Sequence, residues 1–330
     1  MANDKNQKNT ESFQILSLDG GGIKGLFSAA LLAKLEDDLN INVVDHFDLI
    51  TGTSTGGIIA LSLASGMRPK EIVSFYQDYG PKIFNSNSIS WVKRWKHLRG
   101  NLYRSNNLEI ALKDCFGEKT LGECEKRVVI PSYNLGKDEV YIFKTRHHPK
   151  ITRDPRVPLW KAAMATSAAP TYFSSFKKVD HVRLIDGGIW ANNPSVVGIT
   201  EAVNLLNIDL KNIRLLNIGT TSEVVHRSEN LDNGGQWAWK KDAISIALRG
   251  QSIGAFKQAQ LLVGKENAYR IDPLVPDLVF GLDKLKINEL MALAAHESRI
   301  HSPYLAKRFF NHQASEFKQE PLKKTKNEND

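Results

Sequence analysis

Residues 47–64 read FDLITGTSTGGIIALSLA: an apolar run, a glycine-rich turn and a second apolar run. The first run is typical of a short strand, and the second, over residues 58–64, of a buried helix. Between them Gly52, Ser54 and Gly56 form the pattern GxSxG, which is typical of a nucleophile elbow, a sharp strand-to-helix turn that exposes a serine hydroxyl at the edge of a sheet. Glycine is needed on both sides because a Cβ atom would clash in such a turn. The pattern alone also fits a serine that only caps the helix, so this alternative stays open.

A second glycine-rich turn, DGGGIKG at residues 19–25, lies between an expected strand and an expected helix. In it Gly20, Gly22 and Gly25 fit GxGxxG, the fingerprint of a dinucleotide-binding loop. The next apolar run ends in the serine motif, however, and not in an acidic residue that could bind a ribose. This favours the other interpretation, an oxyanion hole made of successive glycine amides, with Lys24 adding positive charge.

A third motif, Asp186-Gly187-Gly188, follows a short apolar stretch that predicts a strand. An Asp-Gly pair is also a common turn, but a serine beside an oxyanion hole needs a base, and this aspartate is placed on the sheet to supply it. Histidine is the usual base, yet none of the nine histidines lies in a recognisable catalytic context. Chain order alone leaves four formal candidates after the aspartate, namely His226, His296, His301 and His312.

Composition narrows the class of protein. The chain has 330 residues, 42% hydrophobic and 24% charged, which is ordinary for a globular protein. No apolar run reaches the roughly 18 residues of a membrane-spanning helix, and the N-terminus shows no signal-peptide core, so we expect the protein in the cytoplasm. Cys115 and Cys124 are too few for a disulfide framework or a zinc cluster, and no side chains have metal-ligand spacing, so no catalytic metal is expected.

The formal net charge of +8 favours an anionic partner, such as an acidic membrane face, nucleic acid or a phosphorylated ligand. Part of the excess lies in residues 91–99, WVKRWKHLR, where aromatic and basic side chains are interleaved. This composition suits a membrane interface and also single-stranded nucleic acid. The tryptophan spacing equally suits a helix packed into the core, so three interpretations of this stretch remain.

Along the chain, short apolar runs alternate with helical patterns, which predicts an α/β sheet covered by helices on both faces. Strands are expected at 13–18, 47–50, 128–133, 140–144, 183–185 and 213–218, and helices at 26–39, 58–64, from Pro69, and at 159–167, 196–206, 243–263 and 287–310. No linker interrupts the pattern. We therefore expect one domain over residues 13–317, with a helical C-terminal part at 240–312 and flexible tails at 1–12 and 318–330.

Together, the three motifs resemble those of the patatin-like phospholipase family, in the same order. Three further blocks are similar to that family: 165–173 (ATSAAPTYF), 192–194 (NNP) and 216–220 (LNIGT). The resemblance covers roughly residues 13–220 and leaves the C-terminal third without a role. It implies a three-layer α/β/α fold with a mostly parallel central sheet.

The resemblance also implies a bacterial-type patatin-like lipid acyl hydrolase that has a serine-aspartate dyad and no histidine, with Ser54 as nucleophile and Asp186 as base. The implied oxyanion hole consists of Gly20, Gly21, Gly22, Lys24 and Thr55, and the other motif glycines are Gly25, Gly52, Gly56, Gly187 and Gly188. The implied substrates are acyl esters of membrane glycerophospholipids, met at an anionic membrane surface without a cofactor and without nucleic acid. Some bacterial members are effectors activated by cyclic nucleotides in phage defence, so such an activator is a hypothesis here.

Two alternatives remain open from the residues alone. One is a dinucleotide-binding oxidoreductase that uses Gly20, Gly22 and Gly25. The other is a basic nucleic-acid-binding module built on residues 91–99.

Overall fold

The central sheet organises the computed structural model, which describes residues 12–84, 105–224, 229–235, 239, 243–276 and 286–320. This sheet has seven strands in the order β4-β3-β2-β1-β6-β8, with β5 paired to β3 off this path. Its strands are β1 (Phe13–Leu18), β2 (Leu49–Gly52), β3 (Arg127–Asn134), β4 (Glu139–Lys144), β5 (Leu184–Asp186), β6 (Ile213–Ile218) and β8 (Ala268–Ile271). Within it, β4 and β5 run antiparallel to β3, and all other pairs are parallel.

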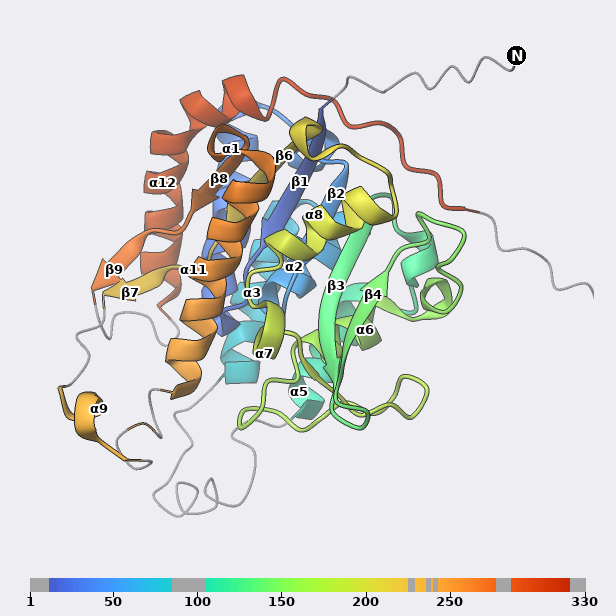
Figure 1. The fold of residues 1–330 in the computed structure, drawn as a ribbon, viewed down its shortest axis with the longest axis vertical. Coiled ribbons are helices and arrows are strands. Elements are labelled where there is room, and N and C mark those ends of the chain that lie inside the picture. The colour runs from blue at the N-terminus through green and yellow to red at the C-terminus, as the bar shows by residue number, and fades with distance from the viewer. Residues whose placement is uncertain are drawn as a thin grey trace, which may run out of the picture.

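Helices cover both faces of this sheet (Figure 1). One face carries α8 (Ser195–Asn204) and α11 (Ala243–Val263), and the other carries α1 (Gly25–Leu39), α2 (Thr55–Ala64), α3 (Pro69–Phe84) and α12 (Ile287–Arg308). The other described α-helices are α5 (Ser105–Phe116), α6 (Leu159–Thr166), α7 (Gly188–Ala191) and α9 (Asn230–Asn233), and β7 (Ser222–Val224) and β9 (Leu274–Pro276) form a two-stranded sheet. The expected three-layer, mostly parallel α/β/α architecture is confirmed. None of the described helices is long and apolar enough to span a lipid bilayer.

The central strand β1 is buried on both faces because successive side chains point to opposite sides of the sheet. Ile15 packs in the cluster beneath α8 and α11, whereas Leu16 and Leu18 pack in the larger cluster with α1 and α2. The parallel register pairs Leu18 with Gly52. The turn after β1 and the turn after β2 therefore begin side by side at the carboxyl edge of the sheet.

Asp186 reaches the same edge through β5. The first three residues of β3, 127–129, pair with β2, and its last three, 132–134, pair with β5, while β4 occupies the other edge of β3. β5 therefore takes up the position along β3 where β2 has ended. Asp186, opposite Ser132, comes beside the turn that follows β2.

Every strand and helix expected from the sequence is present, with bounds that shift by at most three residues. The expected hairpin of β3 and β4 is confirmed. The sequence missed α5, α7, α9, β8 and the small β7–β9 sheet, and β8 shows why. It has four residues, AYRI, of which the middle two are only partly buried, so it offers neither an apolar run nor an alternating pattern. Residues 91–99 lie outside the described residues.

Candidate active site

Ser54 lies in a strained turn between β2 and α2. Its φ of 55° and ψ of −123° fall in a region that residues with side chains rarely adopt. The turn is tight: a Cβ atom on Gly52 would lie 2.1 Å from the Gly56 carbonyl oxygen, and one on Gly56 would lie 2.3 Å from the Leu18 carbonyl oxygen. The Ser54 side chain makes no capping hydrogen bond to α2. The geometry is that of a nucleophile elbow, and the capping alternative is wrong.

The Ser54 backbone is held by Thr166 at the end of α6. The Ser54 amide donates to Thr166 Oγ1 over 3.0 Å, and that hydroxyl donates to the Pro131 carbonyl oxygen over 2.6 Å. Thr166 thereby links the elbow to β3. It belongs to block 165–173, and nothing in its sequence context indicates this anchoring contact.

A hydrogen-bonding interaction with the Ser54 side chain acts to lower the pKa of Asp186. Its Oδ1 atom also accepts a hydrogen bond of 2.7 Å from the Gly188 amide. Burial raises the pKa of Asp186 to about 6, although both hydrogen bonds act to lower it. A carboxylate with a pKa near neutrality is a stronger base than an ordinary aspartate and is still ionised above pH 7.

The glycine loop lies against the elbow. A Cβ atom on Gly20 would lie 3.3 Å from Ser54 Cβ, and one on Gly25 would collide with the Thr55 hydroxyl. Within the described ranges, the amides of Gly21, Gly22 and Thr55 donate to no protein acceptor. Amides gathered in this way beside a serine can stabilise a developing oxyanion.

Two groups of the loop are already bonded within the protein. The Gly20 amide donates to the Asn192 carbonyl oxygen over 2.9 Å. The Lys24 ammonium, which is 9% exposed, donates to the Thr221 carbonyl oxygen over 3.1 Å. Both contacts fix the loop to the segments that flank it.

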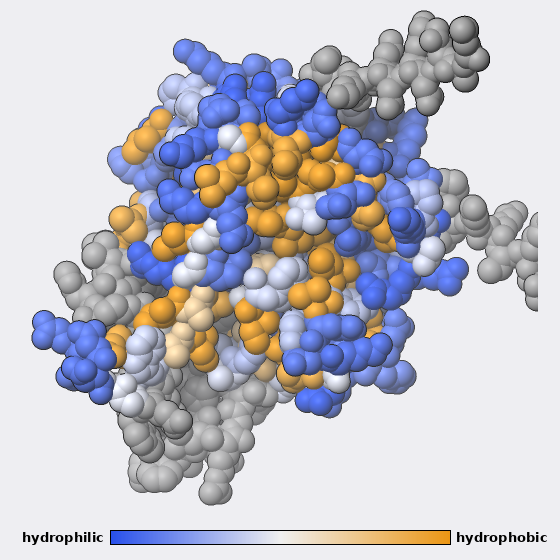
Figure 2. Space-filling view, in the orientation of Figure 1, coloured by the Kyte–Doolittle hydropathy of each residue, from blue (hydrophilic) through white to orange (hydrophobic). Residues whose placement is uncertain are grey.

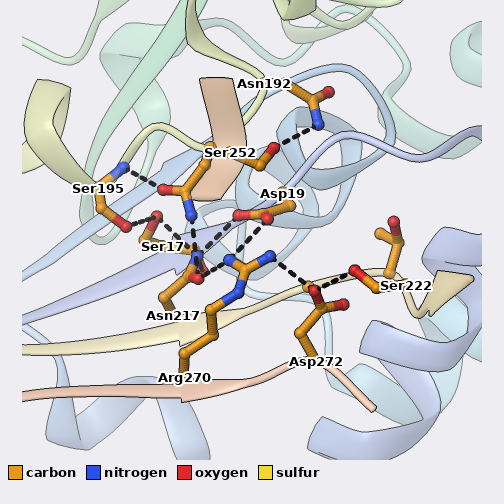
Figure 3. A network of polar contacts seen from close by, with 12 residues as sticks. Ser17, Asp19, Asn192, Ser195, Asn217, Ser222, Ser252, Arg270 and Asp272 are labelled. Atoms are coloured by element: carbon orange, nitrogen blue, oxygen red, sulfur yellow. Dashed lines mark hydrogen bonds and ion pairs between the residues drawn. The ribbon is translucent and has the colours of Figure 1, made fainter. Parts of the chain in front are cut away.

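A buried polar network lies behind the loop (Figure 3). Asp19, the residue before the three glycines, forms an ion pair of 2.8 Å with Arg270 and accepts a hydrogen bond of 2.7 Å from Asn217. Asn217 belongs to the block at 216–220, but nothing in the sequence pointed to Arg270. Only its place on β8, two strands from β1, brings it to this carboxylate.

The formal histidine candidates have other neighbours. His301 contacts Tyr269 and Glu297, His312 pairs with Asp48, and His296 is an exposed residue of α12. His226 lies outside the described residues. No histidine of the described ranges is bonded to Ser54 or Asp186 in the structure, and no group of three or more metal-ligating side chains occurs in those ranges.

A family model described as patatin-like phospholipase matches residues 16–197. The "cGAMP-activated phospholipase" of Escherichia coli (strain TW11681) is 39% identical over 237 residues, which are 68% of this chain and 66% of that protein. The enzyme of the same name from Pseudomonas aeruginosa (strain BWHPSA011 / Pa011) is 34% identical over 288 residues, 84% of each chain. The chain thus spans slightly less than two thirds of the first relative and most of the second.

Among solved structures, VipD from Legionella pneumophila superposes with a TM-score of 0.50 at 14% identity. The superposition covers 91% of this chain and 67% of VipD. At this identity the likeness supports the fold alone, and it reaches into the C-terminal third, beyond the residues that the family model matches.

Proposed function

The chain belongs to the patatin-like phospholipase family, and from that premise we propose that it is a serine hydrolase of acyl esters in membrane glycerophospholipids. One observation carries the proposal: Ser54 lies in a nucleophile elbow, and its side chain acts to lower the pKa of the buried carboxylate of Asp186. The unpaired amides of the glycine loop lie beside it. A nucleophile, a base and an oxyanion hole are the three parts that acyl transfer requires.

In the acylation step, Ser54 Oγ attacks the ester carbonyl carbon and its proton passes to Asp186. The carbonyl oxygen becomes an oxyanion that accepts hydrogen bonds from the amides of Gly21, Gly22 and Thr55. When the ester C–O bond breaks, Asp186 returns the proton to the leaving lysophospholipid oxygen. An acyl-serine remains on the enzyme.

Deacylation repeats these roles with water. Asp186 takes a proton from a water molecule, whose oxygen attacks the acyl carbon, and the bond to Ser54 Oγ breaks. The proton returns to Ser54 and a free fatty acid leaves. Since Asp186 must be ionised at the start of each half-reaction, its raised pKa places the active form above about pH 6.

The test is release of fatty acid from mixed phospholipid vesicles, measured by mass spectrometry without added calcium. Ser54→Ala should abolish release, because the other two hydroxyls of the elbow are engaged elsewhere, that of Thr53 with the Ala191 carbonyl oxygen and that of Thr55 with Tyr76. Ser74→Ala is the matched control, since Ser74 is an exposed residue of α3 whose hydroxyl contacts only the Lys70 carbonyl oxygen. Equal release by wild type and Ser54→Ala would refute the function.

We further propose that a cyclic nucleotide activates the enzyme, as in cyclic-nucleotide-triggered phage defence. Support comes from the relatives in Escherichia coli and Pseudomonas aeruginosa, both named as cGAMP-activated. The basic net charge of +8 is compatible with a phosphodiester ligand. Fatty-acid release should rise with one member of a panel of cyclic di- and trinucleotides, and equal release with every member would count against activation.

The proposed membrane contact involves the face of the molecule that carries α7 and α11. Figure 2 shows hydrophobic residues gathered among polar ones on this face. Ile189, directly after Gly188, is 55% exposed, and on α11 Ile244 and Ile253 are 59% and 50% exposed. Ile253→Asp should weaken sedimentation with anionic vesicles, whereas Ile300→Asp, at a similarly exposed position of α12, should not.

A further inference from the structure

Arg270, from the C-terminal third, and Asn217, on β6, enclose the carboxylate that precedes the glycine loop. Asp19 is 3% exposed, and its Oδ2 atom lies 2.8 Å from Arg270 Nη1. Its Oδ1 atom accepts a hydrogen bond of 2.7 Å from Asn217 Nδ2. Both carboxylate oxygens are therefore engaged (Figure 3), and Arg270 supplies the opposite charge.

Arg270 also holds a second carboxylate. Its Nη2 atom lies 2.8 Å from Asp272 Oδ2, which in turn accepts a hydrogen bond of 2.6 Å from the Ser222 hydroxyl. The guanidinium donates to the Asn217 side-chain oxygen as well. A planar guanidinium can serve three acceptors in fixed directions, which a lysine ammonium at the end of a flexible chain cannot do in the same geometry.

The charges in this network depend on one another. The pKa of Asp19 is raised to about 6, mainly by burial. The charge of Arg270 acts to lower this pKa, and the charge of Asp272 acts to raise it. Without the guanidinium, two carboxylates would face each other in a buried site. Asp19 would then bind a proton or move away, and either change displaces the residue from which the glycine loop starts.

The loop is held on both flanks by segments tied to the C-terminal third. On one flank, Thr220 Oγ1 donates to the Gly20 carbonyl oxygen over 3.3 Å, and the neighbouring Gly219 amide donates to the Ile271 carbonyl oxygen over 2.8 Å. On the other, Asn192 accepts from the Gly20 amide and donates to Ser252 Oγ of α11 over 2.9 Å. The glycine loop therefore cannot move far without breaking one of these hydrogen bonds.

We propose that Arg270 is a positioning residue for the oxyanion hole: by holding Asp19 and Asp272 together, it fixes the turn that presents the Gly21 and Gly22 amides beside Ser54. The proposal rests on the hydrolase function proposed above. Arg270 contacts neither Ser54 nor the reacting atoms and acts through Asp19. It gives the C-terminal third, which lies beyond the family match at 16–197, a part in the chemistry.

The test compares Arg270→Gln, which removes the positive charge, with Arg270→Lys, which keeps the charge but lacks the planar guanidinium that serves three acceptors. Arg153→Gln is the matched control, since Arg153 pairs with the buried Asp154 beside β4, away from the loop. Two rates are measured from pH 5 to 9. They are labelling of Ser54 by a fluorophosphonate probe, in which the serine oxygen displaces fluoride, and fatty-acid release from vesicles as kcat and KM.

We expect Arg270→Gln to lower the labelling rate and kcat about 100-fold with little change in KM, because misplaced oxyanion donors act on the transition state. Arg270→Lys should recover about tenfold of that loss. The acid limb of the pH profile should move to higher pH in Arg270→Gln, where Asp19 has lost its cation, and should stay in place in Arg153→Gln.

Thermal denaturation of each variant separates positioning from folding. The proposal is overturned if folded Arg270→Gln is labelled and turns over at wild-type rates, or if neither the rates nor the acid limb distinguish Arg270→Lys from Arg153→Gln. If Arg270→Gln does not fold, the comparison of Arg270→Lys with Arg153→Gln, by labelling rate, kcat and acid limb, decides whether the proposal stands. Absence of Ser54 labelling and of lipid release in the wild type is a different result, which refutes the hydrolase function and this proposal together.

Discussion

Replacing Asp186 by asparagine should abolish hydrolysis and at the same time stabilise the fold. The carboxylate is 5% exposed, and burial raises its pKa from 3.8 to about 6 despite the hydrogen bonds from Ser54 and the Gly188 amide. Within the described residues no cation forms an ion pair with it. The site therefore holds a base at a cost in stability, and the substitution should reveal both effects.

The magnitude follows from the pKa. A rise from 3.8 to about 6 on folding means that the folded state holds the ionised carboxylate about 3 kcal/mol less favourably than the unfolded state does. Because the folded-state value is the higher one, this penalty is complete above about pH 6 and disappears as the pH falls towards 3.8. At pH 7.5 the free energy of unfolding of Asp186→Asn should thus exceed that of the wild type by up to about 3 kcal/mol, and the two should converge near pH 4. Loss of the base should lower kcat by about 10²- to 10⁴-fold.

Urea denaturation followed by tryptophan fluorescence between pH 4 and 8, together with lipid release, measures both quantities. Asp48→Asn is the matched control: Asp48 is 7% exposed but accepts hydrogen bonds of 2.8 Å from the Gln14 amide and from His312 Nε2. That variant should be less stable than the wild type and remain active. A decrease in stability of Asp186→Asn at pH 7.5, or activity above about a hundredth of wild type, would refute the reasoning.

Three further outcomes are expected. Thr166→Val leaves the Ser54 amide and a buried carbonyl without partners, so it should slow fluorophosphonate labelling about tenfold and lower the melting temperature, whereas Thr166→Ser should restore both; equal labelling of the two variants would contradict the anchoring role. Gly56→Ala places a Cβ atom 2.3 Å from a backbone oxygen and should prevent recovery of folded protein, whereas Gly250→Ala, with open space around it in α11, should fold at least as stably as wild type; normal folding of Gly56→Ala would contradict the packing of the elbow. The wild-type kcat/KM should fall about tenfold per pH unit below about pH 6 as Asp186 takes up a proton, and a flat profile down to pH 5 would show that its ionisation is not required.

The motifs of the candidate site could be predicted because the turns that they form constrain neighbouring residues. A strand, a turn with glycine on both sides of the serine and a buried helix must follow one another for the elbow to form, so Gly52, Ser54 and Gly56 appear together within five positions. The contacts that require these glycines, such as that of Gly56 with the Leu18 carbonyl oxygen, are set by the turn and the adjacent strand. Local sterics of this kind are visible in a sequence.

The residues that hold the site could not be predicted in this way. Thr166 and Arg270 act through partners that are distant along the chain, and each needs only one suitable side chain at one place. β8 is too short to show a strand pattern, so the sequence does not indicate that Arg270 lies in the same sheet as the strand leading to Asp19. No spacing rule connects an arginine there with a carboxylate before a glycine loop.

The elbow and the glycine loop are held by different contacts, and this difference matters for how a ligand could regulate the enzyme. The elbow is fixed by a backbone contact with β1 and by the Thr166 side chain, which links it to β3, so Ser54 has little room to move. The glycine loop has backbone bonds too, but it is also supported by Arg270 of β8 and, through Asn192, by Ser252 of α11, and a ligand could shift these side chains by small displacements. A ligand changes activity only if it binds the active arrangement more tightly than the inactive one. An activator that works through the C-terminal third must therefore make different contacts with two positions of β8 or α11. It would change the position of the glycine-loop amides, which bind the substrate carbonyl oxygen, and leave Ser54 in place.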